Sequence, residues 1–176
     1  MVSKHVAQMK EHLSDNGINP DDHRILHGAV SDVDGEAYYR PMAETDFGHR
    51  VLQRYSEALS DRDDTAVRVP CWTLKSLLEN QSRVSFIHCD IQGEEGRVFR
   101  PSIDLVRRKV ERLLISTHSR SIHRDLRRRF RTAGLEIVYD FPVRSRVRTE
   151  FGDVQFLDGL LCVINPNAGS DQASSH

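Results

Sequence analysis

Apolar residues recur every three or four positions in two segments of the chain, and this spacing predicts two amphipathic helices. The first covers residues 4–16 and ends before Gly17, a residue suited to the left-handed conformation at a helix C-terminus. The second begins after a serine cap, either Ser119 or Ser121, and ends at Gly134. Its arginines lie off an apolar stripe that consists of Ile122, Leu126, Phe130 and Ala133.

Compact apolar runs in the second half of the chain predict strands. Residues 84–90 and 110–117 are predicted as buried strands, the first of them central in its sheet, with a helix broken at Pro101 between them. Residues 135–141 and 155–164 complete the set, and the last strand is expected to fold back on the one before it. This alternation predicts an α/β fold, in which right-handed crossovers join parallel strands and helices cover the faces of the sheet.

The first half of the chain has a weaker pattern. Residues 24–30 and 36–40 predict two strands joined by a turn, and residues 72–78 predict a helix entered through Thr73. Residues 41–68 have many acidic side chains and only a weak apolar period, which is typical of a long mobile loop that contains at most one helix. The fold class is therefore read mainly from the second half.

Composition narrows the classes of function. The chain has 176 residues with 38% hydrophobic content, which fits one domain over residues 1–166 followed by a disordered polar tail over 167–176. A formal net charge of −1 does not indicate nucleic-acid binding, and none is expected. Residues 97–148 are basic, with fifteen Lys or Arg against five Asp or Glu, and a solvated helix face is the usual reason for such a run. Docking to an acidic partner or a phosphorylated substrate is the second interpretation.

The cellular setting is expected to be cytoplasmic. The cysteines Cys71, Cys89 and Cys162 are too few and too scattered for a disulfide framework. No apolar run reaches the length of a signal peptide or a membrane span, so no membrane association is expected.

Polar residues follow two of the predicted strands, where open α/β sheets bind their ligands. Asp90 can accept hydrogen bonds from an ammonium or a hydroxyl, and Gln92 can both donate and accept. Gly93 permits a tight turn into the next helix. The alternative interpretation, with about equal weight, is that Asp90 caps that helix.

His118 follows the next strand and is the candidate general base at neutral pH, against the more common alternative of a structural histidine. His123, on the arginine-rich helix, is expected to be solvated. Together with Asp90 and His118, His88 and Cys89 are possible metal ligands. We expect no metal site, because adjacent strand residues point to opposite faces and cannot both reach one ion.

Several segments resemble the FkbM-type methyltransferases, which are Rossmann-like class I enzymes that use S-adenosylmethionine. The resemblance rests on Asp90-Ile91-Gln92-Gly93-Glu94-Glu95 together with four further segments in the same order. These segments are residues 27–39 (HGAVSDVDGEAYY), 115–120 (ISTHSR), 133–142 (AGLEIVYDFP) and 149–159 (TEFGDVQFLDG). The resemblance implies methyl transfer from S-adenosylmethionine to an oxygen of a small metabolite or sugar.

Carried over position by position, the resemblance also implies roles for single residues. Asp90 and Gln92 would lie near the methionine end of the cofactor and the methyl acceptor. Asp90 or His118 would remove the proton of the acceptor, and Gln92 would position it. The residues implied near the adenine end of the cofactor are Ala29, Val30 and Asp32.

The chain departs from the family pattern at its start. In the family, a strand with a glycine-rich turn and a second strand ending in an acidic residue precede the segment that matches residues 4–16. We therefore expect a Rossmann-like class I methyltransferase sheet that lacks its first two strands and the glycine-rich motif. The sequence is expected to be either a truncated gene model or a complete short product. Either residues 24–30 pair with residues 84–90, or open strand edges invite a second copy or a partner that completes the sheet. The alternative function is a catalytically inactive remnant that acts as a binding or assembly module.

Overall fold

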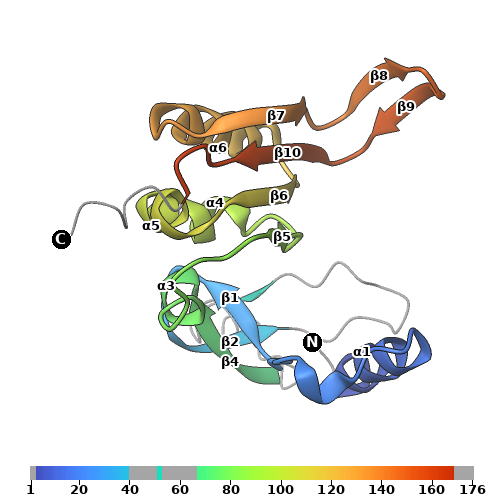
Figure 1. Cartoon of the computed structure of the whole chain (residues 1–176), viewed down its shortest axis with the longest axis vertical. Helices are drawn as coiled ribbons and strands as arrows, with labels where there is room; N and C mark the ends of the chain where they lie inside the picture. Colours follow the sequence, from blue (N-terminus) through green and yellow to red (C-terminus); the bar gives the residue numbers. More distant parts are fainter. Residues whose placement is uncertain (1–2, 40–50, 53–66, 169–176) are drawn as a thin grey trace, which may run out of the picture. The chain divides into compact units, whose positions relative to one another are not determined.

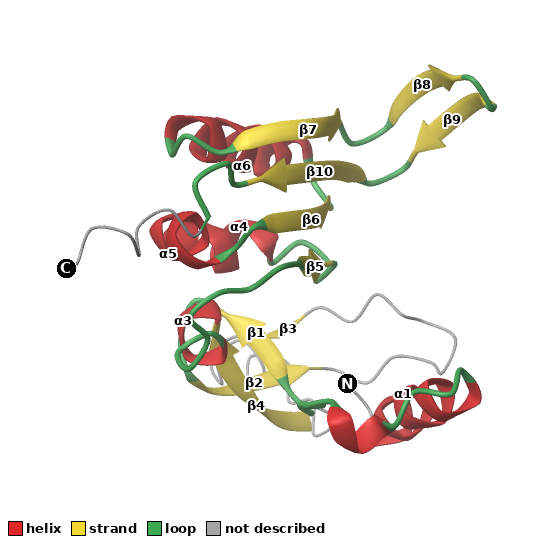
Figure 2. Cartoon of the chain, viewed as in Figure 1, coloured by secondary structure: helices red, strands yellow, loops and turns green. Residues whose placement is uncertain are grey.

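A computed structural model describes residues 3–39, 51–52 and 67–168 of the chain. The chain forms two compact units, Met1–Trp72 and Thr73–His176 (Figure 1). Both units mix helices and strands, so the α/β class predicted from the sequence is confirmed (Figure 2). Most of the segment 41–68 and residues 169–176 of the predicted tail lie outside the described residues.

The first unit contains a helix and a small sheet. Its elements are α1 (Ser3–Asp15), the 3-10 turn η1 (Pro20–Asp22), β1 (Ala29–Ser31), β2 (Gly35–Tyr39), β3 (Val51–Leu52) and β4 (Val67–Thr73). The helix ends as predicted, with Gly17 at a φ of 72°. The strand order is β1-β4-β2-β3, and β2 runs antiparallel to both of its neighbours. The buried apolar residues of this sheet are Ala29, Ala37, Val69 and Cys71.

Two sequence predictions for this unit need correction, and one strand was missed. The strand expected over residues 24–30 is confined to its end, Ala29–Ser31. Strand β4 was not predicted, and Trp72 belongs to it rather than to a helix. The alternation of buried Val69 and Cys71 with exposed neighbours is the signal for that strand, but Pro70 interrupts it in the sequence.

The second unit holds more of the described elements than the first. They are α3 (Leu74–Leu77), β5 (Ile87–Cys89), α4 (Glu95–Phe99), the 3-10 turn η2 (Arg100–Ser102), α5 (Ile103–Lys109), β6 (Arg112–Thr117), α6 (Arg120–Thr132), β7 (Glu136–Phe141), β8 (Ser145–Thr149), β9 (Gly152–Phe156) and β10 (Gly159–Ile164). Thr73 caps α3 by accepting a hydrogen bond from the Ser76 amide, and Ser119 caps α6 in the same way through the Ile122 amide. The helix break predicted at Pro101 is confirmed by η2.

The main sheet of this unit has the strand order β5-β6-β10-β7. Strands β5 and β6 are parallel, and β10 lies antiparallel between β6 and β7, so the predicted return of the last strand is confirmed. The single strand predicted over residues 155–164 is wrong, because the chain leaves β9 and starts β10 only at Gly159. Strands β8 and β9 form a hairpin that extends beyond the ends of β7 and β10 (Figure 1).

The sheet edge differs from the sequence prediction. Residues 84–90 were expected to form a central strand, but β5 is the terminal strand of the described sheet. The pairing of residues 24–30 with residues 84–90 stays a prediction, and within the first unit β1 is hydrogen-bonded to β4. Within the sheet of the second unit, β5 has a described strand on one side only.

The core of the second unit lies under α6. Leu126 and Phe130 on the predicted apolar stripe are both fully buried. The Phe130 ring meets Phe99 edge to face, with ring centroids 6.2 Å apart, which joins α6 to α4. Helix α6 packs on β7 and β10, and it also contacts α4 (Figure 2). This packing fixes the two helices on the sheet that carries the candidate site.

His123 is part of this core, and the prediction that it is solvated is wrong. The residue is 3% exposed. Its Nδ1 lies 2.8 Å from the Thr117 hydroxyl, and its Nε2 lies 2.8 Å from Asp140 Oδ1. Position 123 is three residues before Leu126, which places it at the edge of the apolar stripe. The ring connects β6, α6 and β7 through hydrogen bonds.

Asp140 predicts a measurable acid sensitivity of the fold. Burial alone would raise the pKa of this carboxyl, but hydrogen bonds from His123 and Arg127 outweigh burial and lower the pKa. Because folding lowers the pKa, the stabilisation is present above about pH 4, the ordinary aspartate value, and is lost as the pH falls through the lower folded value. We expect Asp140→Asn to reduce the free energy of unfolding by about 1–3 kcal/mol at pH 7. The difference between variant and native chain should narrow below about pH 4.

Urea unfolding followed by circular dichroism at pH 7 and pH 3 measures this difference. Asp153→Asn is the matched control, since Asp153 lies on the hairpin and its ion pair with Arg146 is exposed. A constant difference between Asp140→Asn and the native chain across this pH range would contradict the role given to the Asp140 carboxylate.

Candidate functional site

The parallel strands β5 and β6 end at the same edge of the sheet. The next residues are Asp90 after β5 and His118 after the last residue of β6, Thr117. His118 Nε2 lies 3.3 Å from Asp90 Oδ1. The structure thus brings together the carboxylate and the histidine that the sequence singled out at two strand tips.

The turn between β5 and α4 has an unusual backbone. Gln92 has a φ of 55° and Gly93 a φ of 100°. Glycine tolerates positive φ, but for glutamine this conformation costs about 1–2 kcal/mol. The side-chain Nε2 of Gln92 donates to Asp90 Oδ1 at 3.4 Å. Glu94 occupies the N-cap position of α4, so the alternative in which Asp90 caps this helix is wrong.

Glu95 is the main residue of the site that sequence reasoning missed. It is the first residue of α4 and is 0% exposed. Its Oε1 accepts hydrogen bonds from the backbone amides of Gly93 (3.0 Å) and Ile91 (3.3 Å), and lies 2.8 Å from His118 Nδ1. The signal for it is the helical spacing of Glu95, Val98 and Phe99, which puts the carboxylate on the buried face of α4.

His118 is consequently held between two carboxylates. Its side chain is 17% exposed, while that of Asp90 is 45% exposed, so the Asp90 side of the ring is the one that faces solvent. One donor atom from each of Asp90, Glu95 and His118 lies within 4.8 Å of the others. Carboxylate, imidazole, carboxylate is a set that can bind a proton or a divalent cation.

Cys89 adds no reactive group to this set. Burial, followed by the negative charges of Glu95 and Asp90, raises the pKa of the Cys89 thiol to about 12. The thiol therefore stays protonated at neutral pH and is not a nucleophile there. His88, its neighbour, is exposed.

The residues expected near the adenine end of a cofactor lie in the first unit. Ala29 is buried, Val30 is half-buried and Asp32 is exposed at the end of β1. The Ser31 hydroxyl donates to Asp32 Oδ1 at 3.0 Å. Their role in cofactor binding stays a prediction.

Comparison with known proteins assigns the chain to a family. The profile of the methyltransferase FkbM domain matches residues 5–137, which include both strand tips and helix α4. The chain belongs to the FkbM methyltransferase family. The resemblance found in the sequence is confirmed at this level.

This FkbM chain is similar to part of a longer protein. The chain is 26% identical over 147 residues to a protein named "Putative methyltransferase" from Jannaschia sp. (strain CCS1). The match covers 79% of this chain and 51% of the relative, so the chain spans about half the length of that protein. No solved structure gives a significant match. No helix among the described residues has the length and apolar character that a membrane span requires.

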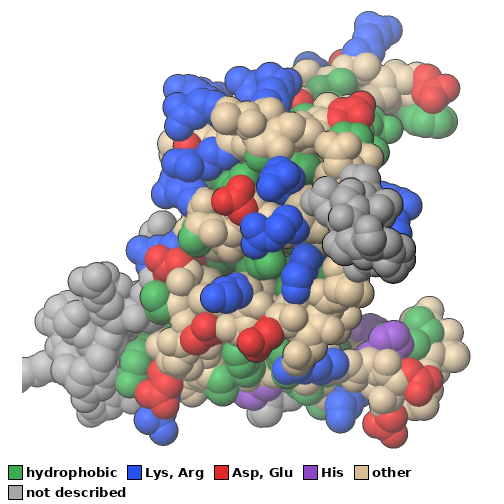
Figure 3. Space-filling view, turned by 60° about the vertical axis from the view of Figure 1, so that its left-hand side comes forward, with side chains coloured by type: hydrophobic (Ala, Val, Ile, Leu, Met, Phe, Trp, Pro, Cys, Tyr) green, Lys and Arg blue, Asp and Glu red, His purple; other side chains and the backbone are tan. Residues whose placement is uncertain are grey.

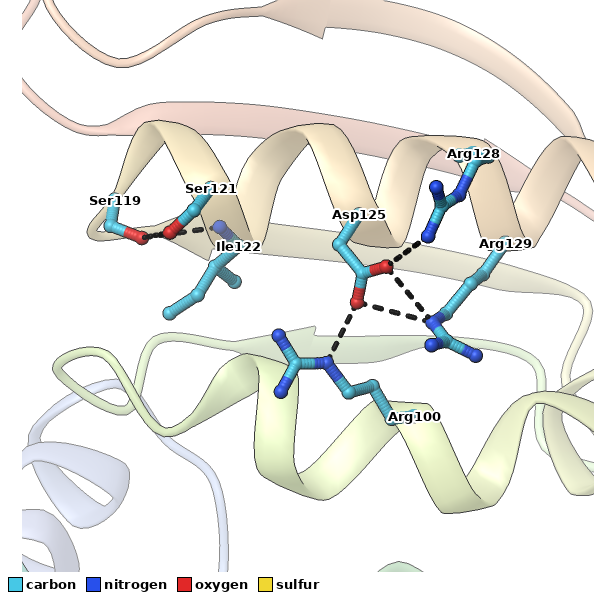
Figure 4. A network of polar contacts seen from close by, with 7 residues as sticks. All are labelled: Arg100, Ser119, Ser121, Ile122, Asp125, Arg128 and Arg129. Atoms are coloured by element: carbon cyan, nitrogen blue, oxygen red, sulfur yellow. Dashed lines mark hydrogen bonds and ion pairs between the residues drawn. The ribbon is translucent and has the colours of Figure 1, made fainter.

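Arginines of η2 and α6 in the FkbM chain form a network of ion pairs around Asp125. Figure 4 shows Arg100, Arg128 and Arg129 converging on Asp125, with nitrogen to oxygen distances of 2.7, 2.8 and 3.1 Å. Burial would raise the pKa of Asp125, but hydrogen bonds from Arg100 and Arg129 lower it. Lys and Arg side chains gather over the second unit (Figure 3). Arg100 joins η2 to α6 through Asp125, whereas Arg128 and Arg129 lie on α6 itself, and the three side chains are 48%, 72% and 41% exposed.

Proposed function

We propose that this FkbM-family chain carries the acceptor side of an S-adenosylmethionine-dependent methyltransferase site, with a hydroxyl oxygen of a small metabolite or sugar as the acceptor. The observation that carries the proposal is the convergence of Asp90, Glu95 and His118 at the tips of two parallel strands. Family membership supplies the methyl-transfer chemistry. The strand tips are the place where Rossmann-like sheets bind ligands.

The chemistry asks little of the protein beyond placement and one base. S-adenosylmethionine, when bound, supplies a methyl group that its positively charged sulfur already activates. Asp90 and Gln92 bind and orient the polar ends of the two reactants, since they offer one carboxylate and one amide at the open side of the site. His118 takes the hydroxyl proton on Nε2, the ring nitrogen that faces Asp90. Ala29, Val30 and Asp32 are the proposed contacts of the adenine end.

Placement carries most of the rate in this proposal, because orienting two bound reactants can supply about 7–11 kcal/mol of the barrier. The strained backbone of Gln92 fits such a role, since unusual φ values of non-glycine residues cluster at functional sites where the surrounding structure holds them. The Rossmann-like class I architecture is supported by the parallel pair β5–β6 with α4 and α5 between its strands.

The second candidate is a non-catalytic assembly module. One specific observation favours it: β5 is the terminal strand of its sheet among the described strands, and an open edge can pair with another chain. The partner would be a second copy or a chain that completes the sheet. This candidate predicts self-association or partner binding in sedimentation, without methyl transfer.

A transfer assay separates the two candidates. The chain is incubated with S-adenosylmethionine labelled in the methyl group and with a pool of sugars and hydroxylated metabolites, and the product is separated by chromatography. We expect label in an O-methylated product and equimolar S-adenosylhomocysteine. Label that stays in the cofactor with every acceptor, from a chain that circular dichroism shows to be folded, would contradict catalysis and favour the assembly module.

A further inference from the structure

We propose that Glu95 is the positioning residue of this site: its buried carboxylate fixes the tautomer of His118 so that Nε2 is free to accept the proton of the acceptor. In the same proposal, Asp90 stabilises that proton after its transfer. The inference rests on the proposed function for its chemical purpose. Its geometry stands on the contacts of Glu95 alone.

The hydrogen bonds of Glu95 determine which ring nitrogen carries the proton. The amides of Ile91 and Gly93 can only donate, so the Glu95 Oε1 that they share is an acceptor. His118 Nδ1 approaches the same oxygen at 2.8 Å and must therefore be its third donor. A neutral imidazole has one protonated nitrogen, so Nε2 is bare and basic when Nδ1 carries the proton.

The cost of placing Glu95 here indicates a role beyond packing. The side chain is fully buried, and its Oε2 has no hydrogen-bond partner among the described residues. A buried polar atom without a partner costs about 1–3 kcal/mol. The positive φ values of Gln92 and Gly93 accompany the arrangement that aims two backbone amides at Oε1. An apolar residue at position 95 would avoid this cost. A role in positioning His118 explains why a glutamate is found there instead.

The opposite side of the ring has room for a proton. In the neutral tautomer, Nε2 and Asp90 Oδ1 are both acceptors, and they lie 3.3 Å apart. A proton placed on Nε2 turns this pair into a charge-assisted hydrogen bond, and the positive ring then lies between two carboxylates. The transferred proton is thereby held at a defined atom while the methyl group moves.

The complete step balances. The acceptor O–H bond breaks, its proton forms a bond to Nε2, and the oxygen electron pair forms a bond to the methyl carbon. The carbon–sulfur bond breaks, and its electron pair stays on sulfur, which leaves neutral S-adenosylhomocysteine. Release of the proton from His118 to water resets the ring, with Nδ1 still donating to Glu95 throughout.

Nitrogen NMR of the full chain tests the tautomer without turnover. The chain is labelled with ¹⁵N in its histidine rings and measured at increasing pH until the ring signals stop shifting, and the signals of His118 are assigned by their loss in His118→Gln. We expect a protonated Nδ1 and a bare Nε2 in the native chain. In Glu95→Ala we expect the opposite tautomer, because Nε2–H can then donate to Asp90.

Two further variants sharpen the test. Glu95→Gln keeps an acceptor oxygen for the two backbone amides, so it should retain the native tautomer while it removes the charge. Glu94→Ala, at the adjacent position, is the matched control and should leave the His118 signals unchanged. In the transfer assay, Glu95→Ala should lower kcat by about 100-fold with little change in the KM for S-adenosylmethionine. The wrong tautomer of His118 impairs proton removal from the acceptor, whereas it does not affect cofactor binding.

The outcomes that overturn the inference are definite. They are a native His118 with a protonated Nε2, a Glu95→Ala variant with the native tautomer, or stoichiometric binding of Mn²⁺ or Zn²⁺ at Nε2, since a metal would occupy the lone pair that must accept the proton. The native spectrum alone decides the first point if Glu95→Ala does not fold. A chain that shows the expected tautomers and transfers no methyl group contradicts the proposed function and leaves the positioning role supported.

Discussion

Replacing Phe130 with alanine is expected to lower the free energy of unfolding by about 3–5 kcal/mol. Phe130 is fully buried on α6 and meets Phe99 edge to face, so alanine leaves a cavity between α6 and α4 and removes the ring contact. Because small domains are stable by only about 5–15 kcal/mol, a loss of this size endangers the second unit and the candidate site together.

Urea unfolding followed by far-UV circular dichroism measures the loss. Phe151→Ala is the matched control, because Phe151 is 92% exposed at the tip of the β8–β9 hairpin and its removal should change stability by less than about 0.5 kcal/mol. Equal losses for the two variants would contradict the assignment of the core to the α4–α6 contact.

Replacing His118 with alanine is expected to lower the rate of methyl transfer by about 10²–10⁴-fold, the usual contribution of a positioned general base. The ring lies between Glu95 and Asp90, and no other described imidazole shares these contacts. Binding of S-adenosylhomocysteine should change by less than about threefold, because the proposed work of His118 is done on the proton of the acceptor.

The labelled-methyl assay with His118→Ala and His88→Ala tests this directly. His88 is exposed on the adjacent strand β5 and has no role in the proposed reaction, so its variant should keep the native rate. A His118→Ala variant that transfers methyl at the native rate would remove the general base from the account, while a loss in both variants would indicate damage to β5 and β6.

The elements that the sequence predicted well are those with a strong apolar period. Helix α6 shows this clearly, since Leu126 and Phe130 repeat at four-residue spacing and both are fully buried. Strands β5 and β6 were found because short apolar runs end in polar residues. Strand β4 was missed because Pro70 lacks an amide hydrogen and is unusual inside a sheet, although it pairs with Glu36 here.

Sheet order was harder to predict than strand position. The apolar runs of β1 and β5 say nothing about which neighbour each strand takes, and the structure places them in different sheets. The hairpin β8–β9 was not predicted, apart from the last two residues of β9, which were joined to β10 in one strand; its residues are mostly exposed and carry no apolar run. Tertiary context decides both features.

Some residues of the candidate site could be selected from the sequence, and others were found only in the structure. Asp90, Gln92 and His118 could be selected because each follows a predicted strand or belongs to the turn after it. Glu95 and His123 were not selected, because a charged or titratable residue at the border of an apolar stripe is usually solvated. Their burial depends on contacts from other elements, Glu95 with His118 and His123 with Asp140.

The central claim is that this FkbM chain binds the cofactor through the tip of β5, and calorimetric titration of the folded 176-residue chain with S-adenosylhomocysteine tests it most directly. We predict a Kd between about 1 µM and 1 mM, which is about −8 to −4 kcal/mol. Asp90→Asn should weaken binding by about tenfold or more through the loss of a charge-assisted hydrogen bond, whereas Asp153→Asn should not. A folded chain that releases no heat with millimolar S-adenosylhomocysteine at two temperatures would contradict the claim.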